Sequence, residues 1–243
     1  MPAPTSDAVS QAPLILACDT TQGACSAALY QDGLLADRLQ TMRQGHAEIL
    51  LGMVADMMQA CGLEMAQIDR LAVTNGPGTF TGVRVGIAAM RGLALALGRP
   101  VKTYGTLEVM AAAARSDTPL LVAVDARRET FYVQLFDGNK TPLCPPAAVT
   151  ANEAVALVGD LVPEAAEGPP RIGVMGSGAS LLVDKAPRFF VCAAPDYPNA
   201  AHLAEMAARD TAWEGLPPAE PLYLRPPDAS LPDRSKYPAR QDR

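Results

Sequence analysis

Basic residues are few and scattered in this sequence, which argues against a protein that binds nucleic acid by itself. The 243 residues include 20 Lys and Arg against 26 Asp and Glu, so the formal net charge at pH 7 is -6. A nucleic-acid-binding protein usually carries a basic stripe, because contacts to phosphates supply much of the affinity. No such stripe is visible, and the lysines are isolated: Lys102, Lys140, Lys185 and Lys236. Any role in RNA chemistry would therefore depend on a partner.

Histidine is almost absent, which limits metal and acid–base chemistry. The two histidines are His46 and His202. A zinc site needs three or four protein ligands. Leu50 and Met206 stand four residues after the two histidines, so neither starts an H-x-x-x-H pair. A G-x-S-x-G nucleophile motif is also missing. We therefore predict no catalytic residue and no metal site.

The cysteine pattern and the lack of long apolar runs indicate a cytoplasmic protein. The five cysteines form no C-x-x-C pair and mostly stand in apolar runs, where a thiol behaves as a small hydrophobe. We interpret them as reduced core residues. The stretch nearest to a membrane span, 83–97, is interrupted by Arg84 and Arg91, so we expect no membrane segment. The first 13 residues lack the basic and apolar regions of a signal peptide.

What is present is an alternation of short apolar strands and helices that occurs twice. Apolar runs and turn signals predict strands at 14–20, 24–31, 34–40, 69–74, 101–104, 119–125, 130–136 and 171–176. Helical periodicity and end signals predict helices at 45–61, 80–98, 106–115, 151–159 and 199–212. The second series is a shorter version of the first, which predicts two related lobes. We expect a flexible tail at 1–12, an N-terminal partner-binding lobe at 13–105, a reduced C-terminal lobe at 106–225, and a flexible tail at 226–243.

Two of the predicted helices are unusually apolar. A surface helix normally buries one apolar stripe and exposes a polar remainder. Helix 45–61 keeps only a narrow polar stripe, and helix 80–98 is apolar almost all round, apart from Arg84 and Arg91. One sheet would not cover two such surfaces, and exposed apolar patches of this size mark interaction sites. The sequence therefore predicts a subunit interface, in a homodimer or a heterodimer.

Three loops could hold phosphate or nucleotide, but each signal is weak. Asp19-Thr20-Thr21 ends a strand and is a candidate vestigial phosphate loop, although Asp and Thr commonly begin turns. Gly76-Pro77-Gly78 precedes a helix, but it lacks the G-K-[ST] of a Walker loop, and a sharp turn with Thr79 or Thr81 capping the helix is simpler. The glycines of 171–180 are fewer than an adenosine-binding turn needs. We therefore expect no cofactor and no ATP binding by the isolated chain.

The densest charged cluster is Asp125, Arg127, Arg128 and Glu129. An ion-pair network between strands, a partner contact and a solvated turn are all compatible with it.

Several segments together resemble the TsaB family. ILACDTTQGACSAAL is similar to the opening strand of TsaB and its paralogue TsaD, and RQGHAEILLGMV to the start of the first long helix in TsaB. NGPGTFTGVRVGIAAMRGLALALG resembles the long G-P-G-S-F-T-G signature, and VDARRETFYVQLF a later segment. The resemblance covers about 14–136 well and the rest loosely. PLYLRPPDA also matches a common closing pattern.

The resemblance implies a two-lobed actin-like, sugar-kinase-like ATPase fold, with a mixed sheet flanked by helices in each lobe. It also implies a cytoplasmic, non-catalytic subunit that pairs with a TsaD-like catalytic subunit. With a TsaE-like ATPase, the assembly transfers a threonylcarbamoyl group to the adenosine beside the anticodon in tRNA, and tRNA is contacted only through the complex. Alone, the chain would form a homodimer through the same surface. Positions carried over from the family, together with Met57 and Arg91 of the same helices, give the predicted surface: His46, Glu48, Leu50, Val54, Met57, Phe80, Arg84, Ile87, Met90 and Arg91.

One departure separates the chain from the TsaD-like enzymes. Those enzymes hold metal with a histidine pair on the first long helix, and the second histidine is missing from His46-Ala47-Glu48-Ile49-Leu50. Two other functions remain as alternatives. One is a free-standing ATPase or small-molecule kinase of the actin-like fold. The other is a zinc peptidase, which stoichiometric zinc bound by side chains would support.

Overall fold

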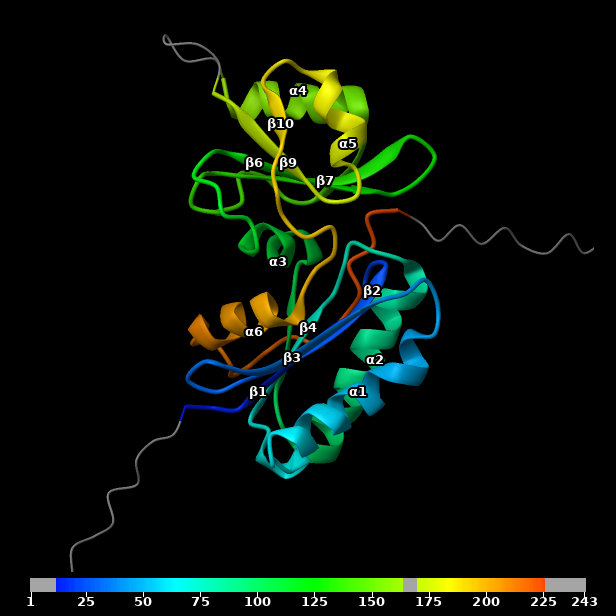
Figure 1. Cartoon of the computed structure of the whole chain (residues 1–243), viewed down its shortest axis with the longest axis vertical. Helices are drawn as coiled ribbons and strands as arrows, with labels where there is room; N and C mark the ends of the chain where they lie inside the picture. The colour runs from blue at the N-terminus through cyan, green and yellow to red at the C-terminus, as the bar shows by residue number, and fades with distance from the viewer. Residues whose placement is uncertain (1–11, 164–169, 226–243) are drawn as a thin grey trace, which may run out of the picture.

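The computed structural model describes residues 12–163 and 170–225, and they form two lobes joined by a narrow waist (Figure 1). Each lobe contains one five-stranded mixed sheet with helices on both faces. The two predicted tails, except for Ala12, lie outside the described residues.

The sheet of the first lobe has the strand order β3-β2-β1-β4-β5. Its strands are β1 (Ile15–Asp19), β2 (Ala24–Tyr30), β3 (Leu34–Thr41), β4 (Arg70–Thr74) and β5 (Val101–Tyr104). The first three strands are antiparallel, and β1, β4 and β5 are parallel. Asp32-Gly33 makes the tight β2–β3 turn that the sequence predicts, with both residues at positive φ. All five residues of β1 are buried, because helices cover it on both sides.

The two apolar helices lie side by side on one face of this sheet. They are α1 (His46–Ala60) and α2 (Phe80–Leu97). Leu16 and Cys18 of β1 point to them, whereas Ile15 and Ala17 point to α6 (Ala200–Arg209) on the opposite face, as strand alternation requires. The expectation that 106–225 is one C-terminal lobe is therefore wrong at its end. The chain returns after the second lobe, and α6 buries its apolar side against the first.

The second lobe repeats the strand order of the first. Its sheet runs β10-β9-β6-β7-β8, so β6 occupies the central place that β1 holds in the first lobe. The strands are β6 (Leu120–Asp125), β7 (Thr130–Phe136), β8 (Ala147–Thr150), β9 (Ile172–Met175) and β10 (Phe189–Val191). Two helices cover one face, α4 (Ala151–Leu161) and the single turn α5 (Ala179–Leu182), and α3 (Thr106–Ala112) covers the other. Short 3-10 turns are η1 (Met65–Gln67) and η2 (Val183–Lys185).

Helix α2 begins and ends where the sequence predicts. Thr79 caps its start by accepting a hydrogen bond of 3.1 Å from the backbone N–H of Gly82. Gly98 closes its end in the left-handed conformation, with φ 65°, which glycine adopts without strain. Among the described residues, α2 is one helix with the length and composition of a membrane span, with a mean hydropathy of 1.4. It packs on β4 and β5, yet only 28% of it is buried.

Candidate functional site

The candidate phosphate loop after β1 is closed off from solvent. Asp19, Thr20 and Thr21 are each at most 1% exposed. The Asp19 carboxylate accepts hydrogen bonds from the hydroxyls of Thr21 and Thr74 and from the backbone N–H of Thr21. Burial raises the pKa of Asp19 to about 6, although these hydrogen bonds oppose the rise. The loop thus has no free surface on which to receive a phosphate.

The start of α2 is what covers this loop. The backbone N–H of Thr79 donates a hydrogen bond of 2.8 Å to the carbonyl of Thr21. A Cβ at Gly78 would lie 2.3 Å from that carbonyl oxygen, and one at Gly82 would lie 2.1 Å from the carbonyl oxygen of Thr20. Only glycine permits these approaches. The glycines of the G-P-G-T-F-T-G segment therefore serve contact with the chain's own backbone, and the turn contains a cis Gly76–Pro77 bond.

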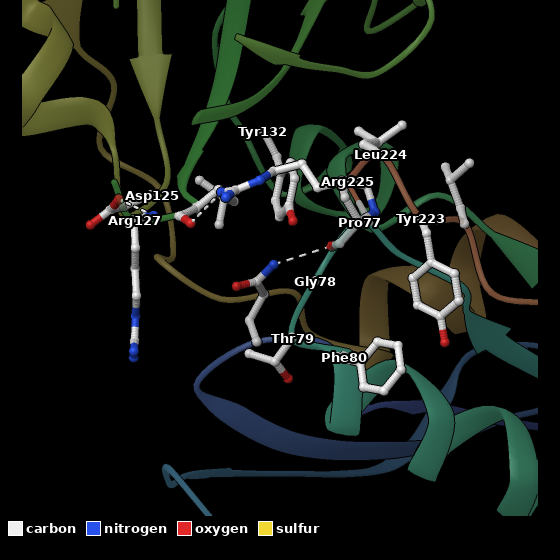
Figure 2. Close-up of a pocket in the computed structure, with 14 residues that line it drawn as sticks. Pro77, Gly78, Thr79, Phe80, Asp125, Arg127, Tyr132, Tyr223, Leu224 and Arg225 are labelled. Carbon is white, nitrogen blue, oxygen red and sulfur yellow. Dashed lines mark hydrogen bonds between the residues drawn. The ribbon is translucent and has the colours of Figure 1, made fainter. Parts of the chain in front are cut away.

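A cleft of about 310 Å³ lies between the lobes, beside the closed loop (Figure 2). Gln22, Pro77 and Phe80 line it from the first lobe, and Asp125 and Arg127 line it from the second. The side-chain N–H of Gln22 donates to the carbonyl of Pro77 at 3.2 Å. Polar and apolar side chains both line the cleft, and Asp19, Thr20 and Thr21 are not among the residues that line it.

Residues 220–225, which we call the C-terminal strap, line part of this cleft with 222–225. The backbone N–H of Leu222 donates to the carbonyl of Asn75 at 2.7 Å, which joins the strap to the first lobe. Arg225 donates from Nη1 to the carbonyl of Ala126 at 3.0 Å, which joins it to the second lobe. The Tyr223 ring stacks on Phe80 at the start of α2, with ring centroids 5.3 Å apart. Apart from the motif PLYLR, nothing in the amino-acid sequence indicates these contacts.

The charged cluster of the second lobe forms the exposed β6–β7 turn. Three successive residues, Arg127, Arg128 and Glu129, adopt positive φ values of 52–63°, which is strained for side chains of this kind. The Asp125 carboxylate accepts from the backbone N–H of Arg127 at 2.7 Å and so helps to fix the turn. Nearby, a Cβ at Gly178 would lie 2.8 Å from the Phe131 ring. The glycine-containing turn that was considered for adenosine binding is therefore packed against the protein's own side chain.

The predicted partner surface divides into buried and exposed residues, and part of it needs correction. Six of the ten residues are buried inside the first lobe: His46, Leu50, Val54, Met57, Ile87 and Met90. The five apolar ones among them belong to the core between α1, α2 and the sheet. They cannot contact a partner while the lobe is folded, because their side chains are already packed inside the lobe. Four remain exposed: Glu48, Phe80, Arg84 and Arg91.

A different set of apolar residues on the same two helices does face solvent. We call it the outer face: Ala47, Leu51, Ala55, Ala88, Gly92 and Leu95. Leu51 is 50% exposed and Leu95 is 87% exposed. These residues are shifted around the helix axis from the core residues, since positions one apart in a helix are separated by 100°. The two helices therefore expose apolar side chains, but most of these are not the residues that the sequence analysis selected.

The two histidines have different environments. His202 lies 3.8 Å from the Glu205 carboxylate on α6. His46 is buried at the first residue of α1, and its Nε2 has no hydrogen-bond partner among the described residues. In residues 12–163 and 170–225, no group of three or more His, Cys, Asp or Glu side chains is placed to hold a metal ion. None of the five cysteines is in a disulfide.

Two sheets with one strand order, each flanked by helices, and a cleft between the two lobes define a two-lobed α/β protein of the actin-like fold. The solved structure "YeaZ from Pseudomonas aeruginosa" matches it with a TM-score of 0.71 and 29% identity, over 87% of this chain and 100% of that chain. A second Pseudomonas aeruginosa structure, of an uncharacterized protein with similarity to peptidase YEAZ, matches with a TM-score of 0.72 and 27% identity, over 88% of this chain and 100% of that one.

Sequence relatives then identify the family. The family model described as "TsaD: tRNA N6-adenosine threonylcarbamoyltransferase" matches residues 38–175, more than half of the chain. The tRNA threonylcarbamoyladenosine biosynthesis protein TsaB of Escherichia coli (strain K12) is 40% identical over 121 residues, which is 49% of this chain and 52% of that protein. The match thus spans about half the length of that curated relative. The uncharacterized protein Rv3421c of Mycobacterium tuberculosis is 33% identical over 220 residues, or 88% of this chain and 93% of that one. This chain belongs to the TsaB family, of which YeaZ is another name.

Proposed function

We propose that this chain is a cytoplasmic, non-catalytic partner subunit in the synthesis of threonylcarbamoyladenosine in tRNA. In this proposal it pairs with a TsaD-like catalytic subunit and activates it, and a TsaE-like ATPase completes the assembly. The assembly transfers a threonylcarbamoyl group to the adenosine beside the anticodon. Family membership supports the pathway, because the Escherichia coli relative is named a tRNA threonylcarbamoyladenosine biosynthesis protein.

The observation that carries the pairing is the outer face of α1 and α2. It exposes large apolar side chains such as Leu51 and Leu95, next to small residues such as Ala88 and Gly92 that let another helix approach closely. Helix α2 has the mean hydropathy of a membrane span, and only 28% of its residues are fully buried. Apolar surface of this extent is removed from water when a partner binds, which favours association. In the absence of the TsaD-like subunit, a second copy of the chain would occupy the same face.

Two further features support a role without catalysis of its own. The candidate phosphate loop is covered by the start of α2, so Asp19 cannot contact a bound nucleotide as it stands. The net charge of -6 also disfavours independent tRNA binding. Contact with tRNA is therefore assigned to the assembly as a whole.

Reconstitution tests the proposal. The chain is mixed with the TsaD-like and TsaE-like subunits of the same genome, tRNA, ATP and threonylcarbamoyl-adenylate, and each component is omitted in turn. We expect this chain to co-purify with the TsaD-like subunit. We also expect tRNA modification to be lost when this chain or the TsaD-like subunit is left out. Modification at an unchanged rate without this chain would contradict an activating role. Micromolar ATP binding by the isolated chain, measured by calorimetry, would instead favour the ATPase or kinase alternative.

A further inference from the structure

Arg84 of α2 lies beside a stacked aromatic pair, formed by Phe80 one turn earlier in the same helix and Tyr223 of the strap. Its guanidinium carbon is 3.5 Å from the centroid of the Phe80 ring and 5.6 Å from that of Tyr223. Its Nε donates a hydrogen bond of 2.7 Å to the Tyr223 hydroxyl. Phe80 and Tyr223 are 38% and 40% exposed, so this group of Arg84 and two rings lies on the surface. The stacked rings and the hydrogen bond together fix the plane of the guanidinium.

The strap holds Tyr223 in this place through its backbone. Leu222, the preceding residue, donates to the Asn75 carbonyl at 2.7 Å, and the Asn75 side chain donates to the Glu220 carbonyl at 3.3 Å. A Cβ at Gly76 would lie only 2.7 Å from the Leu222 carbonyl oxygen, and Gly76 has φ 114°. Such a close approach requires glycine. Tyr223 is thus anchored to the turn before α2.

Arg84 makes no ion pair with an acidic side chain of the described residues. Its one hydrogen bond uses Nε, so the two terminal nitrogens remain available on the exposed side. A guanidinium with its plane fixed is suited to bind a carboxylate through two parallel N–H···O bonds, and Phe80 and Tyr223 reduce the entropy lost when that pair forms. The site lies on α2, the helix that also carries half of the outer face.

We propose that Tyr223 is a positioning residue of the docking surface, which holds the Arg84 guanidinium ready for a carboxylate of the protein partner. The proposal rests on the proposed function, because the partner is the TsaD-like subunit. It extends the docking surface from α1 and α2 to the C-terminal strap, and it gives the aromatic residue of PLYLR a role in affinity.

Binding measurements with the TsaD-like subunit, in the absence of RNA, test this inference. We expect Tyr223→Ala to weaken binding about tenfold and Tyr223→Phe about threefold, because phenylalanine keeps the stacking and loses the hydrogen bond. Arg84→Lys should not restore full affinity, since lysine keeps the charge and loses the planar fork. Arg115→Ala, which removes an exposed positive charge away from α1 and α2, serves as the matched control and should leave binding unchanged.

A double-mutant cycle separates positioning from a general structural effect. If Tyr223 acts through Arg84, Tyr223→Ala should have almost no further effect on affinity once Arg84→Ala is present. Thermal unfolding of each variant shows whether the lobe is intact. Additive losses, or Tyr223 variants that bind as tightly as the unaltered chain, overturn this inference and leave the proposed function standing. Failure of the unaltered chain to bind the TsaD-like subunit overturns both.

Discussion

The hydroxyl of Thr20 donates a hydrogen bond of 2.6 Å to the backbone carbonyl of Gly82. This bond joins the loop after β1 to the first turn of α2, two segments 62 residues apart in the sequence. A threonine that could contact a nucleotide in an ATPase is here part of a helix–loop contact. The same contact fixes the place on the sheet at which α2 begins, and with it the direction of the outer face.

Replacing Gly82 by alanine tests how tight this contact is. The new Cβ would stand 2.1 Å from the Thr20 carbonyl oxygen, so α2 must move. We expect Gly82→Ala to lower the free energy of unfolding by about 1–3 kcal/mol, measured by urea denaturation. Gly52→Ala in α1 is the matched control, because nothing lies within 4 Å of its Cβ. That variant should be more stable by up to about 1 kcal/mol from helix propensity alone. Equal changes in the free energy of unfolding for the two variants would show that the contact between Gly82 and Thr20 is loose.

Leu51→Glu should abolish pairing without unfolding the lobe. Leu51 is half-exposed on the outer face, so a glutamate there is solvated in the monomer. In a complex the charge would be buried without a partner, which costs several kcal/mol. Size-exclusion chromatography with light scattering should show loss of association, while the melting temperature stays close to that of the unaltered chain. Association of the variant at unaltered strength would place the interface elsewhere.

The neighbouring residue should behave in the opposite way. Leu50 is 1% exposed and lies in the core between α1 and the sheet. Leu50→Ala should therefore lower the free energy of unfolding by about 2–5 kcal/mol. The folded fraction should still pair, because the outer face is untouched. Denaturation curves together with light scattering distinguish the two variants, and a stable Leu50→Ala protein that fails to pair would reverse the assignment of faces.

Asp19 should make the protein less stable as the pH rises. Its pKa is about 6 in the folded chain against an ordinary value of 3.8, so between these values the folded state holds more protons than the unfolded state. The free energy of unfolding then falls by about 2 kcal/mol from pH 4 to pH 6 through this group. Asp19→Asn removes this contribution, so the variant should gain stability relative to the unaltered chain over that interval. A constant difference between the two denaturation series would show that the carboxyl titrates normally.

The sequence was sufficient to predict most elements of the fold. Strands such as β1 and helices such as α2 carry long apolar patterns with clear end signals, among them Thr79 and Gly98, and their bounds agree to within one or two residues. The short elements β8, β10 and α5 were not predicted, because three or four residues give only a weak pattern, although the four-residue strands β5 and β9 were found. The place of α6 was also missed. Its amphipathic pattern predicts a helix, but nothing local indicates which lobe covers its apolar side.

The candidate site was predictable only in part. The sequence shows that a helix is apolar on most of its sides. It does not indicate which side packs on the sheet and which side stays exposed. Leu50 and Leu51 are adjacent leucines, yet Leu50 is buried and Leu51 is half-exposed. Tyr223 lies 139 residues from Arg84, so their contact depends on the path of the strap, which no local pattern reveals.

The two lobes share one strand order, and in this order α5 stands where α2 stands in the first lobe. The second-lobe counterpart is a four-residue turn in place of an 18-residue helix. A protein with an exposed apolar helix pair on each lobe could assemble head to tail into open-ended filaments. If α1 and α2 form the docking surface as proposed, association stops once that surface is occupied, and the expected product is a dimer.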